Sequence, residues 1–128
     1  MTGAQTRQSL ELALRRLTLL TPSFAYGVTH PMKAIELFRT KDAYGAGFIE
    51  IVIWQVPQPV PPSEHPYKYR LVYVIDGKRI VGYDNERGKG DHKHLGDSEE
   101  PYRFVNPQQL MVDFMTDVRG SRQSITPP

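Results

Sequence analysis

The dipeptide Asp76-Gly77 fixes more of the fold than any other pair of residues in this chain. Both residues readily adopt the positive φ angle that a two-residue hairpin turn requires. The flanking segments, 67–75 and 78–84, are rich in tyrosine, valine and isoleucine, which is the composition of β-strands. The sequence therefore predicts an antiparallel hairpin from residue 67 to residue 84.

A two-residue turn also fixes the register of the hairpin, and hence which side chains share a face. We expect Ile75 to lie opposite Lys78, and Arg70 to lie opposite Tyr83. One face of the hairpin is then apolar and is predicted to join the core, with Gly82 on the same side. Its residues are Tyr69, Leu71, Tyr73, Ile75 and Ile80. The other face is cationic and carries Lys68, Arg70, Arg79 and Tyr83.

Four further segments have the patterns of regular structure. Leucine and alanine recur at helical spacing over residues 6–20. Residues 34–40 and 48–56 predict two strands, the second with apolar residues on both faces. Asn106, followed by a proline, predicts the N-cap of an amphipathic helix over residues 107–118.

Together these elements predict an α+β domain built on an antiparallel sheet of four to five strands. The C-terminal helix would pack on one face of the sheet, and the N-terminal helix would be peripheral. We expect residues 1–31 to form a helical extension and residues 32–118 to form the domain. Residues 119–128 are polar and contain proline and serine, so a disordered tail is predicted there.

The chain has 128 residues and no cysteine, which suits one small domain and excludes disulfide and thiolate chemistry. We find no signal peptide and no apolar run near the roughly 20 residues of a membrane span, so we expect a cytoplasmic protein. The net charge is only +2, but residues 68–93 contain seven Lys or Arg and four acids. This locally basic segment favours an anionic ligand.

Residues 83–94 contain most of the reactive chemistry that the sequence offers. They hold three cations, three carboxylates and two histidines. His92 or His94 can transfer protons near neutral pH, while Lys89 and Lys93 can neutralise a phosphate. RNA cleavage through the 2′-hydroxyl needs only a base, an acid and a cation. The first interpretation is therefore a metal-free acid–base and phosphate site.

Two other interpretations of this segment remain open. In one, a divalent metal is bound by Asp84, Asp91, His92 and His94, because alternate residues of an extended strand lie on one side. The neighbouring lysines argue against a cation there. In the other, these residues only close a turn and lie on the surface.

The aromatic residues have competing interpretations as well. Tyrosines within 67–75 could stack on nucleotide bases, but residues spaced by two on a strand more often pack in a core. Trp54 is also expected in the core. His65 lies next to a proline in a connector, and we expect no function for it. Arg70 and Tyr83, if paired across the hairpin, are stronger candidates for substrate contact.

The segment 83–94, Tyr-Asp-Asn-x-x-Gly-Lys-Gly-Asp-His-Lys-His, resembles the TumE family of bacterial toxin–antitoxin proteins. The resemblance includes the segment 68–71 with its Asp-Gly hairpin. It also includes the segment 100–104, which precedes the amphipathic helix. In all, it extends over residues 32–118.

The resemblance implies a small toxin, with an activity like that of RNA-cleaving toxins, neutralised by a helix-turn-helix antitoxin. We therefore expect metal-independent RNA cleavage with no cofactor and no membrane partner. The expected catalytic residues are His92, His94, Lys89 and Asp91, the last of which would orient a histidine. The expected substrate-binding residues are Arg70, Tyr83, Asp84, Asn85, Lys93 and Arg87.

Two other functions fit the same residues. One is a non-catalytic module that binds nucleic acid or protein through the basic hairpin. The other is a metal-dependent nuclease or nucleotide-modifying enzyme.

Overall fold

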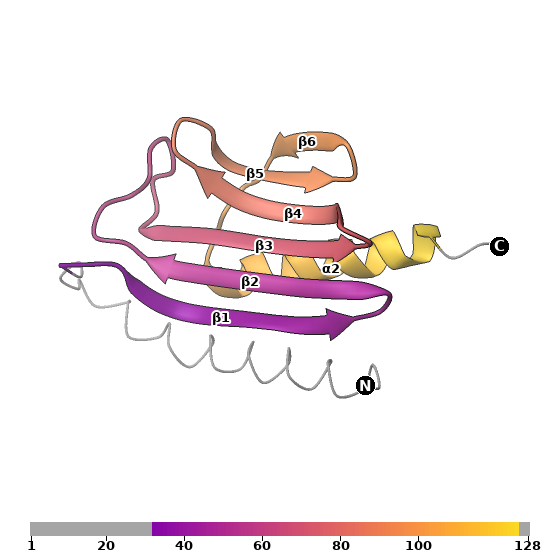
Figure 1. Cartoon of the computed structure of the whole chain (residues 1–128). Coiled ribbons are helices and arrows are strands. Elements are labelled where there is room, and N and C mark those ends of the chain that lie inside the picture. Colours follow the sequence, from indigo (N-terminus) through magenta and orange to yellow (C-terminus); the bar gives the residue numbers. More distant parts are fainter. Residues whose placement is uncertain (1–31, 126–128) are drawn as a thin grey trace.

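The computed structural model describes residues 32–125, with side chains as far as Ser121. These residues form an antiparallel sheet in which every strand lies beside the next strand of the chain (Figure 1). The strands are β1 (Ile35–Tyr44), β2 (Gly47–Gln55), β3 (Tyr67–Ile75), β4 (Lys78–Glu86), β5 (Gly90–Leu95) and β6 (Ser98–Pro101). The helix α2 (Pro107–Ile125) follows β6. The α+β class is therefore confirmed.

The described sheet has six strands rather than the predicted four to five. The strands predicted at 34–40 and 48–56 are present, and the first extends to Tyr44. The predicted strand count is too low because residues 90–101, with their charged composition, give no strand pattern of their own. They pair because β4 would otherwise leave a row of backbone donors and acceptors without partners. The predicted N-terminal helix, residues 6–20, lies outside the described residues.

The helix α2 begins where the sequence predicts. The side-chain oxygen of Asn106 accepts a hydrogen bond from the Gln109 amide at 2.7 Å, as an N-cap residue does. The helix continues past its predicted end at Val118 to Ile125. After residue 107 the first proline is Pro127, so no helix-breaking residue interrupts this polar segment. The described part of the chain contains no helix with the length and apolarity that a membrane span needs.

Figure 1 shows α2 lying behind the sheet, where it covers one of the two faces. We call this face the helix face and the opposite one the distal face. Because side chains alternate along a strand, each strand contributes residues to both faces. The buried core on the helix face includes Ile49, Ile51, Ile53, Tyr69, Leu71, Tyr73, Val81, Tyr83, Leu110, Met111, Phe114, Met115 and Val118. The distal face carries Trp54, Lys68, Arg70, Asp84, His92 and His94.

A β-bulge in β4 changes the predicted register of the β3–β4 hairpin. The turn is as predicted, but Tyr73 lies opposite Val81, and Ile80 is an extra residue in β4. An extra residue moves every later side chain of its strand to the other face. The alternation of apolar residues gives no sign of this bulge, because Ile80 and Val81 are both apolar and adjacent.

The bulge exchanges the faces of the residues that lead into the segment 83–94. Tyr83 lies opposite Leu71 and is 1% exposed in the core, so the predicted pairing of Arg70 with Tyr83 is wrong. Asp84 instead lies opposite Arg70 on the distal face. Gly82, which is predicted on the core side, also lies on the distal face.

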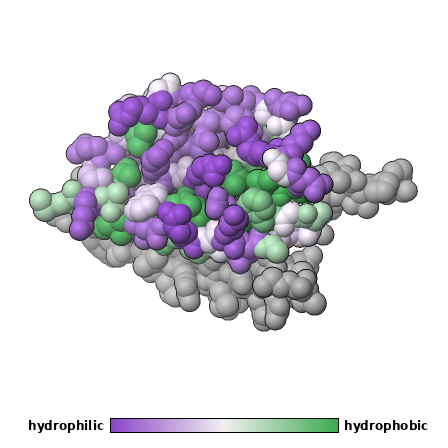
Figure 2. Space-filling model, in the orientation of Figure 1, coloured by the Kyte–Doolittle hydropathy of each residue, from purple (hydrophilic) through white to green (hydrophobic). Residues whose placement is uncertain are grey.

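Trp54 is a second departure from the predicted core. It lies partly exposed on the distal face, opposite Lys68. Since β2 has apolar residues on both faces, alternation does not show which of them the helix covers. In Figure 2, hydrophobic residues of the distal face gather over β2 and β3, and hydrophilic residues cover the region of β4 to β6.

The proline-rich connector between β2 and β3 packs against the turn between β4 and β5. The Gly88 amide donates a hydrogen bond to the Pro61 carbonyl at 2.9 Å. Pro62 lies against Gly90, where a Cβ atom would come within 3.0 Å of the proline ring. The connector therefore holds the turn that precedes the histidines of β5.

Candidate active site

The distal face brings Asp84, His92 and His94 together across β4 and β5. Asp84 lies opposite His92, and His94 is the next residue of β5 on the same face. The donor atoms of the three side chains all lie within 4.8 Å of one another. The prediction that both histidines lie on one side of a strand is therefore confirmed. We call these three residues the His–Asp cluster.

His92 is buried, and oxygen atoms lie close to both of its ring nitrogens. Nδ1 lies 2.9 Å from the Gly90 carbonyl oxygen, and Nε2 lies 2.6 Å from Asp84 Oδ1. Both oxygens are hydrogen-bond acceptors, so each lies against a ring nitrogen that can carry a hydrogen. The contact with Asp84 is an ion pair without the alignment of a hydrogen bond, because Asp84 Oδ1 has no hydrogen-bond partner among the described residues.

His94 has a different environment from its neighbour. Its ring lies 5.1 Å from the His92 ring between centroids, at an interplanar angle of 83°. Burial lowers the pKa of His94 below the ordinary 6.5, and the positive charges of Arg79 and His92 lower it further. The carboxylates of Glu99 and Asp84 oppose this shift without cancelling it. His94 is therefore a neutral imidazole near neutral pH.

Arg79 reaches this position because the residue opposite His94 is a glycine, Gly82. A Cβ atom at residue 82 would lie 2.7 Å from Arg79 Cδ, which is closer than van der Waals contact. The arginine side chain thus lies across Gly82. Sequence reasoning does not place Arg79 in the site, since its approach to His94 depends on the β-bulge.

Lys89 joins the site through a carboxylate that sequence reasoning also missed. Lys89 Nζ lies 3.3 Å from Glu99 Oε1, and the same oxygen lies 3.8 Å from His92 Nε2. A hydrogen bond from Lys89 lowers the pKa of the Glu99 carboxyl. Glu99 comes from β6, whose pairing with β5 places it opposite His94.

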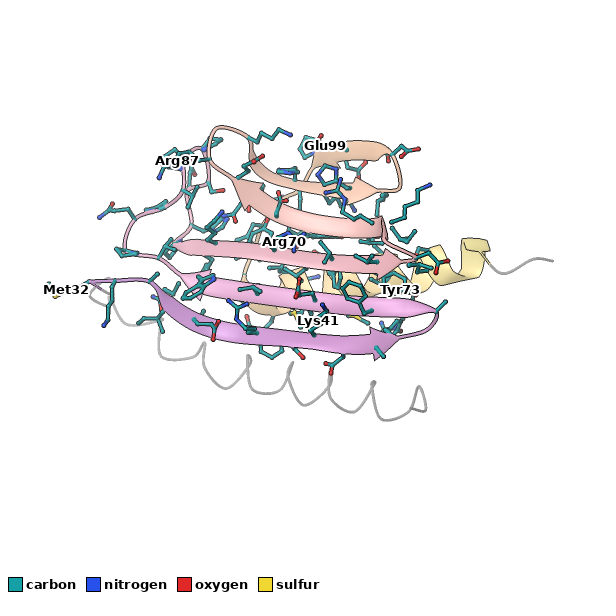
Figure 3. All side chains as sticks on the ribbon, viewed as in Figure 1. Met32, Lys41, Arg70, Tyr73, Arg87 and Glu99 are labelled. Carbon is teal, nitrogen blue, oxygen red and sulfur yellow. The ribbon has the colours of Figure 1, made fainter. Side chains whose placement is uncertain are left out.

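Arg70 and Arg87, the two arginines predicted to bind substrate, are both exposed. Arg70 shares a cross-strand row with Asp84, and its Nη1 lies 3.5 Å from Glu50 Oε1. Arg87 lies in the turn between β4 and β5. Figure 3 shows Arg70 near the middle of the sheet and Arg87 at its edge.

Asp91, predicted as a catalytic residue, lies on the helix face. Its carboxylate accepts hydrogen bonds from the hydroxyls of Ser63 and Tyr69, both at 2.6 Å, and contacts His65 Nε2 at 2.7 Å. Burial raises the pKa of Asp91, but the hydrogen bonds from His65, Ser63 and Tyr69 outweigh it. The pKa of Asp91 therefore lies below its ordinary value of 3.8.

The histidine that Asp91 orients is thus His65, and not His92 or His94. The His65 ring also stacks on Phe104, with 3.8 Å between centroids. No local sequence pattern connects His65 with a carboxylate 26 residues away. This contact joins the proline-rich connector, β5 and the segment before α2.

Lys93 and Tyr83 also lie on the helix face, apart from the His–Asp cluster. The Tyr83 hydroxyl donates a hydrogen bond to Asp117 of α2. Lys93 Nζ lies 3.2 Å from the same carboxylate and 3.4 Å from Glu100. Lys93 therefore neutralises acids of this chain, and its position is not beside the histidines.

Asn85, predicted to contact substrate, is completely buried. Its side-chain oxygen accepts a hydrogen bond from the Tyr69 amide at 2.9 Å. Its side-chain nitrogen donates one to the Tyr67 carbonyl at 2.7 Å. Asn85 therefore ties β4 to the start of β3.

The His–Asp cluster has the donor atoms of a divalent metal site, with two imidazoles and one carboxylate. Of the four predicted metal ligands, Asp91 lies on the helix face and does not join them. Ligand atoms about 2.1 Å from a tetrahedral metal lie about 3.4 Å apart. The 2.6 Å between Asp84 and His92 is shorter, so a metal would require these two side chains to separate.

The residues that form the sheet and its distal face match a known protein family. A protein-family model described as Toxin TumE matches residues 27–122. The chain belongs to the TumE family. The predicted resemblance is therefore confirmed, and the match includes all six strands and the whole His–Asp cluster. Searches of curated proteins and of solved structures each gave no match. As a TumE protein, the chain has the role of a toxin, and this role implies an antitoxin partner.

Proposed function

We propose that this TumE protein cleaves RNA by metal-independent acid–base chemistry on the distal face of its sheet. The proposal depends chiefly on one observation, the pairing of Asp84 with His92 directly beside His94. Of these two adjacent imidazoles, one lies against a carboxylate and the other has a lowered pKa, so the pair can supply an acid and a base in one site.

In this proposal His94 is the general base. It takes the proton of an RNA 2′-hydroxyl, and the 2′-oxygen forms a bond to the adjacent phosphorus. The bond from phosphorus to the 5′-oxygen breaks, and His92 donates its proton to that oxygen. The products are a 2′,3′-cyclic phosphate and a 5′-hydroxyl. Asp84 stabilises the protonated form of His92 before this transfer.

Three cations of the distal face are available for the negative charge that gathers on the phosphoryl oxygens. Arg79 lies beside His94, Lys89 is linked to His92 through Glu99, and Arg70 shares a row with Asp84. Charge stabilisation of this kind is often the largest single contribution to catalysis. Lys93 is assigned no part in it, because Asp117 and Glu100 already neutralise its charge.

The depressed pKa of His94 gives a test of its role as base. Cleavage should rise with pH as His94 loses its proton, with a midpoint below 6.5. The variant Arg79→Gln removes one of the two positive charges that repel the His94 imidazolium, so the pKa of His94 rises and the midpoint moves to higher pH. The kcat/KM of cleavage measured against pH gives both midpoints. A midpoint that stays the same or falls in Arg79→Gln would show that His94 is not the group that titrates.

A metal-dependent nuclease is the second candidate, and one observation favours it. Asp84 Oδ1 is buried and has no hydrogen-bond partner among the described residues, as a metal ligand would be before the ion binds. The response of cleavage to a chelator separates the two candidates.

We also propose a helix-turn-helix antitoxin as the partner and the cytoplasm as the compartment. The TumE assignment supports both proposals, because a toxin implies an antitoxin. RNA and a DNA-binding antitoxin would both be present in the cytoplasm.

A further inference from the structure

A groove of about 420 Å³ lies on the distal face next to the His–Asp cluster. Its walls include Trp54 of β2, Lys68 and Arg70 of β3, and Asp84 and Glu86 of β4. Asp84 belongs both to the groove and to the His–Asp cluster, so the two features are continuous. The groove is therefore placed to hold a part of the substrate that adjoins the reacting phosphate.

The residues of the groove form an ordered series across the strands. Trp54 lies opposite Lys68, and in the next row on the same face Arg70 lies opposite Asp84, which lies opposite His92. Neighbouring strands lie about 4.8 Å apart. An aromatic ring, two cations and the proposed acid thus follow one another over a span comparable to one or two nucleotides.

We propose that this groove binds one nucleotide of single-stranded RNA, with its base stacked on Trp54 and its phosphate between Lys68 and Arg70. The inference rests on the proposed RNA cleavage and names the subsite beside it. Any base can stack on an indole ring, and stacking of this kind is common where proteins hold single strands.

The chemistry of the walls favours a nucleotide over a bare anion. Lys68 Nζ donates a hydrogen bond to the Asn85 carbonyl at 3.2 Å, which holds the ammonium at the wall of the groove. Arg70 is exposed, and its ion-pair partner among residues 32–121 is Glu50, at 3.5 Å. The carboxylate of Glu86 would repel a free phosphate nearby, but it can accept hydrogen bonds from a base or a ribose hydroxyl.

Trp54 is the single tryptophan of the chain, so its fluorescence reports on this groove alone. The probe is a short single-stranded oligonucleotide with 2′-O-methyl groups, which lacks the hydroxyl that would attack phosphorus. We expect it to quench the fluorescence of the wild-type protein. Labelled probe should bind Trp54→Leu on the order of tenfold more weakly. The variants Lys68→Ala and Arg70→Ala should also bind it more weakly, with reduced dependence on salt.

Two matched variants serve as controls. Phe48→Leu removes an aromatic ring from the same strand and the same face, and Lys78→Ala removes an exposed cation at the β3–β4 turn. Neither should alter binding of the probe. Binding of labelled probe without quenching, equal affinity in Trp54→Leu, or no binding at all would overturn the inference. Quenching by the antitoxin but not by the oligonucleotide would assign the groove to a protein and overturn it as well.

The proposed nucleotide subsite and the proposed RNA cleavage can be disproved independently of each other. If the wild-type protein binds and quenches but cuts no RNA, the subsite stands and the proposed function falls. If it cuts RNA while Trp54→Leu cuts and binds equally well, the function stands and the subsite falls. His94→Ala should bind the probe like the wild type and cleave nothing.

Discussion

Replacing both His92 and His94 by alanine should abolish growth arrest and reduce RNA cleavage at least about a thousandfold. In the proposed mechanism the two rings supply the acid and the base, and the described residues include no other imidazole beside Asp84. The measurement is cleavage of a defined RNA by purified protein, together with growth of cells that express the variant.

The single variants His92→Gln and His94→Gln separate loss of chemistry from loss of fold. His92 is buried and contacts the Gly90 carbonyl, so glutamine keeps a polar side chain in its place. Both variants should unfold at a temperature near that of the wild type and still bind the antitoxin. Growth arrest and RNA cleavage at wild-type levels in the folded double variant would contradict an active site at this cluster.

Replacing Asp91 by alanine should lower the free energy of unfolding by about 3 kcal/mol. The change leaves Ser63, His65 and Tyr69 without the oxygen that each of them contacts. Asp97→Ala is the matched control, because Asp97 is exposed in the turn between β5 and β6, and its loss should cost less than about 0.5 kcal/mol. Chemical denaturation at neutral pH gives both values.

The same carboxylate predicts how stability depends on acid. The pKa of Asp91 is lower in the folded protein than its ordinary 3.8, so the folded state favours the carboxylate form. This contribution is fully present above 3.8 and is lost as the pH falls through the folded pKa. The wild-type protein should therefore lose stability in that range more steeply than Asp91→Ala. Equal slopes, or an unchanged stability at neutral pH, would show that Asp91 does not hold the connector to β5.

The hairpin, the second strand and the start of α2 could be predicted because each has a local signal. Asp76-Gly77 supplies a turn, and Asn106 supplies a cap. The end of α2 could not be predicted, because a polar helix and a polar disordered tail have similar compositions. The bulge at Ile80 could not be predicted either, because Ile80 and Val81 are both apolar and the alternation does not show which of them is the extra residue.

Part of the candidate site could also be predicted from a local sequence signal. His92 and His94 alternate along β5, so they share a face once that segment is a strand. The same alternation places Asp91 and Lys93 on the opposite face, where they meet α2 and the connector. The side-chain contacts across strands could not be predicted from the sequence. Arg79 reaches His94, and Asp91 reaches His65, only through the register of the folded sheet.

The proposed function requires that the His–Asp cluster activates the 2′-hydroxyl of RNA without a metal. The most direct test compares an RNA oligonucleotide with a copy that carries a single 2′-deoxy substitution at the cut nucleotide, both in the presence of EDTA. We predict that the RNA is cut to a 2′,3′-cyclic phosphate and a 5′-hydroxyl, and that the substituted copy is not cut at that position. Cleavage that requires added Mn²⁺ or Mg²⁺, or that proceeds equally at the 2′-deoxy nucleotide, would contradict it.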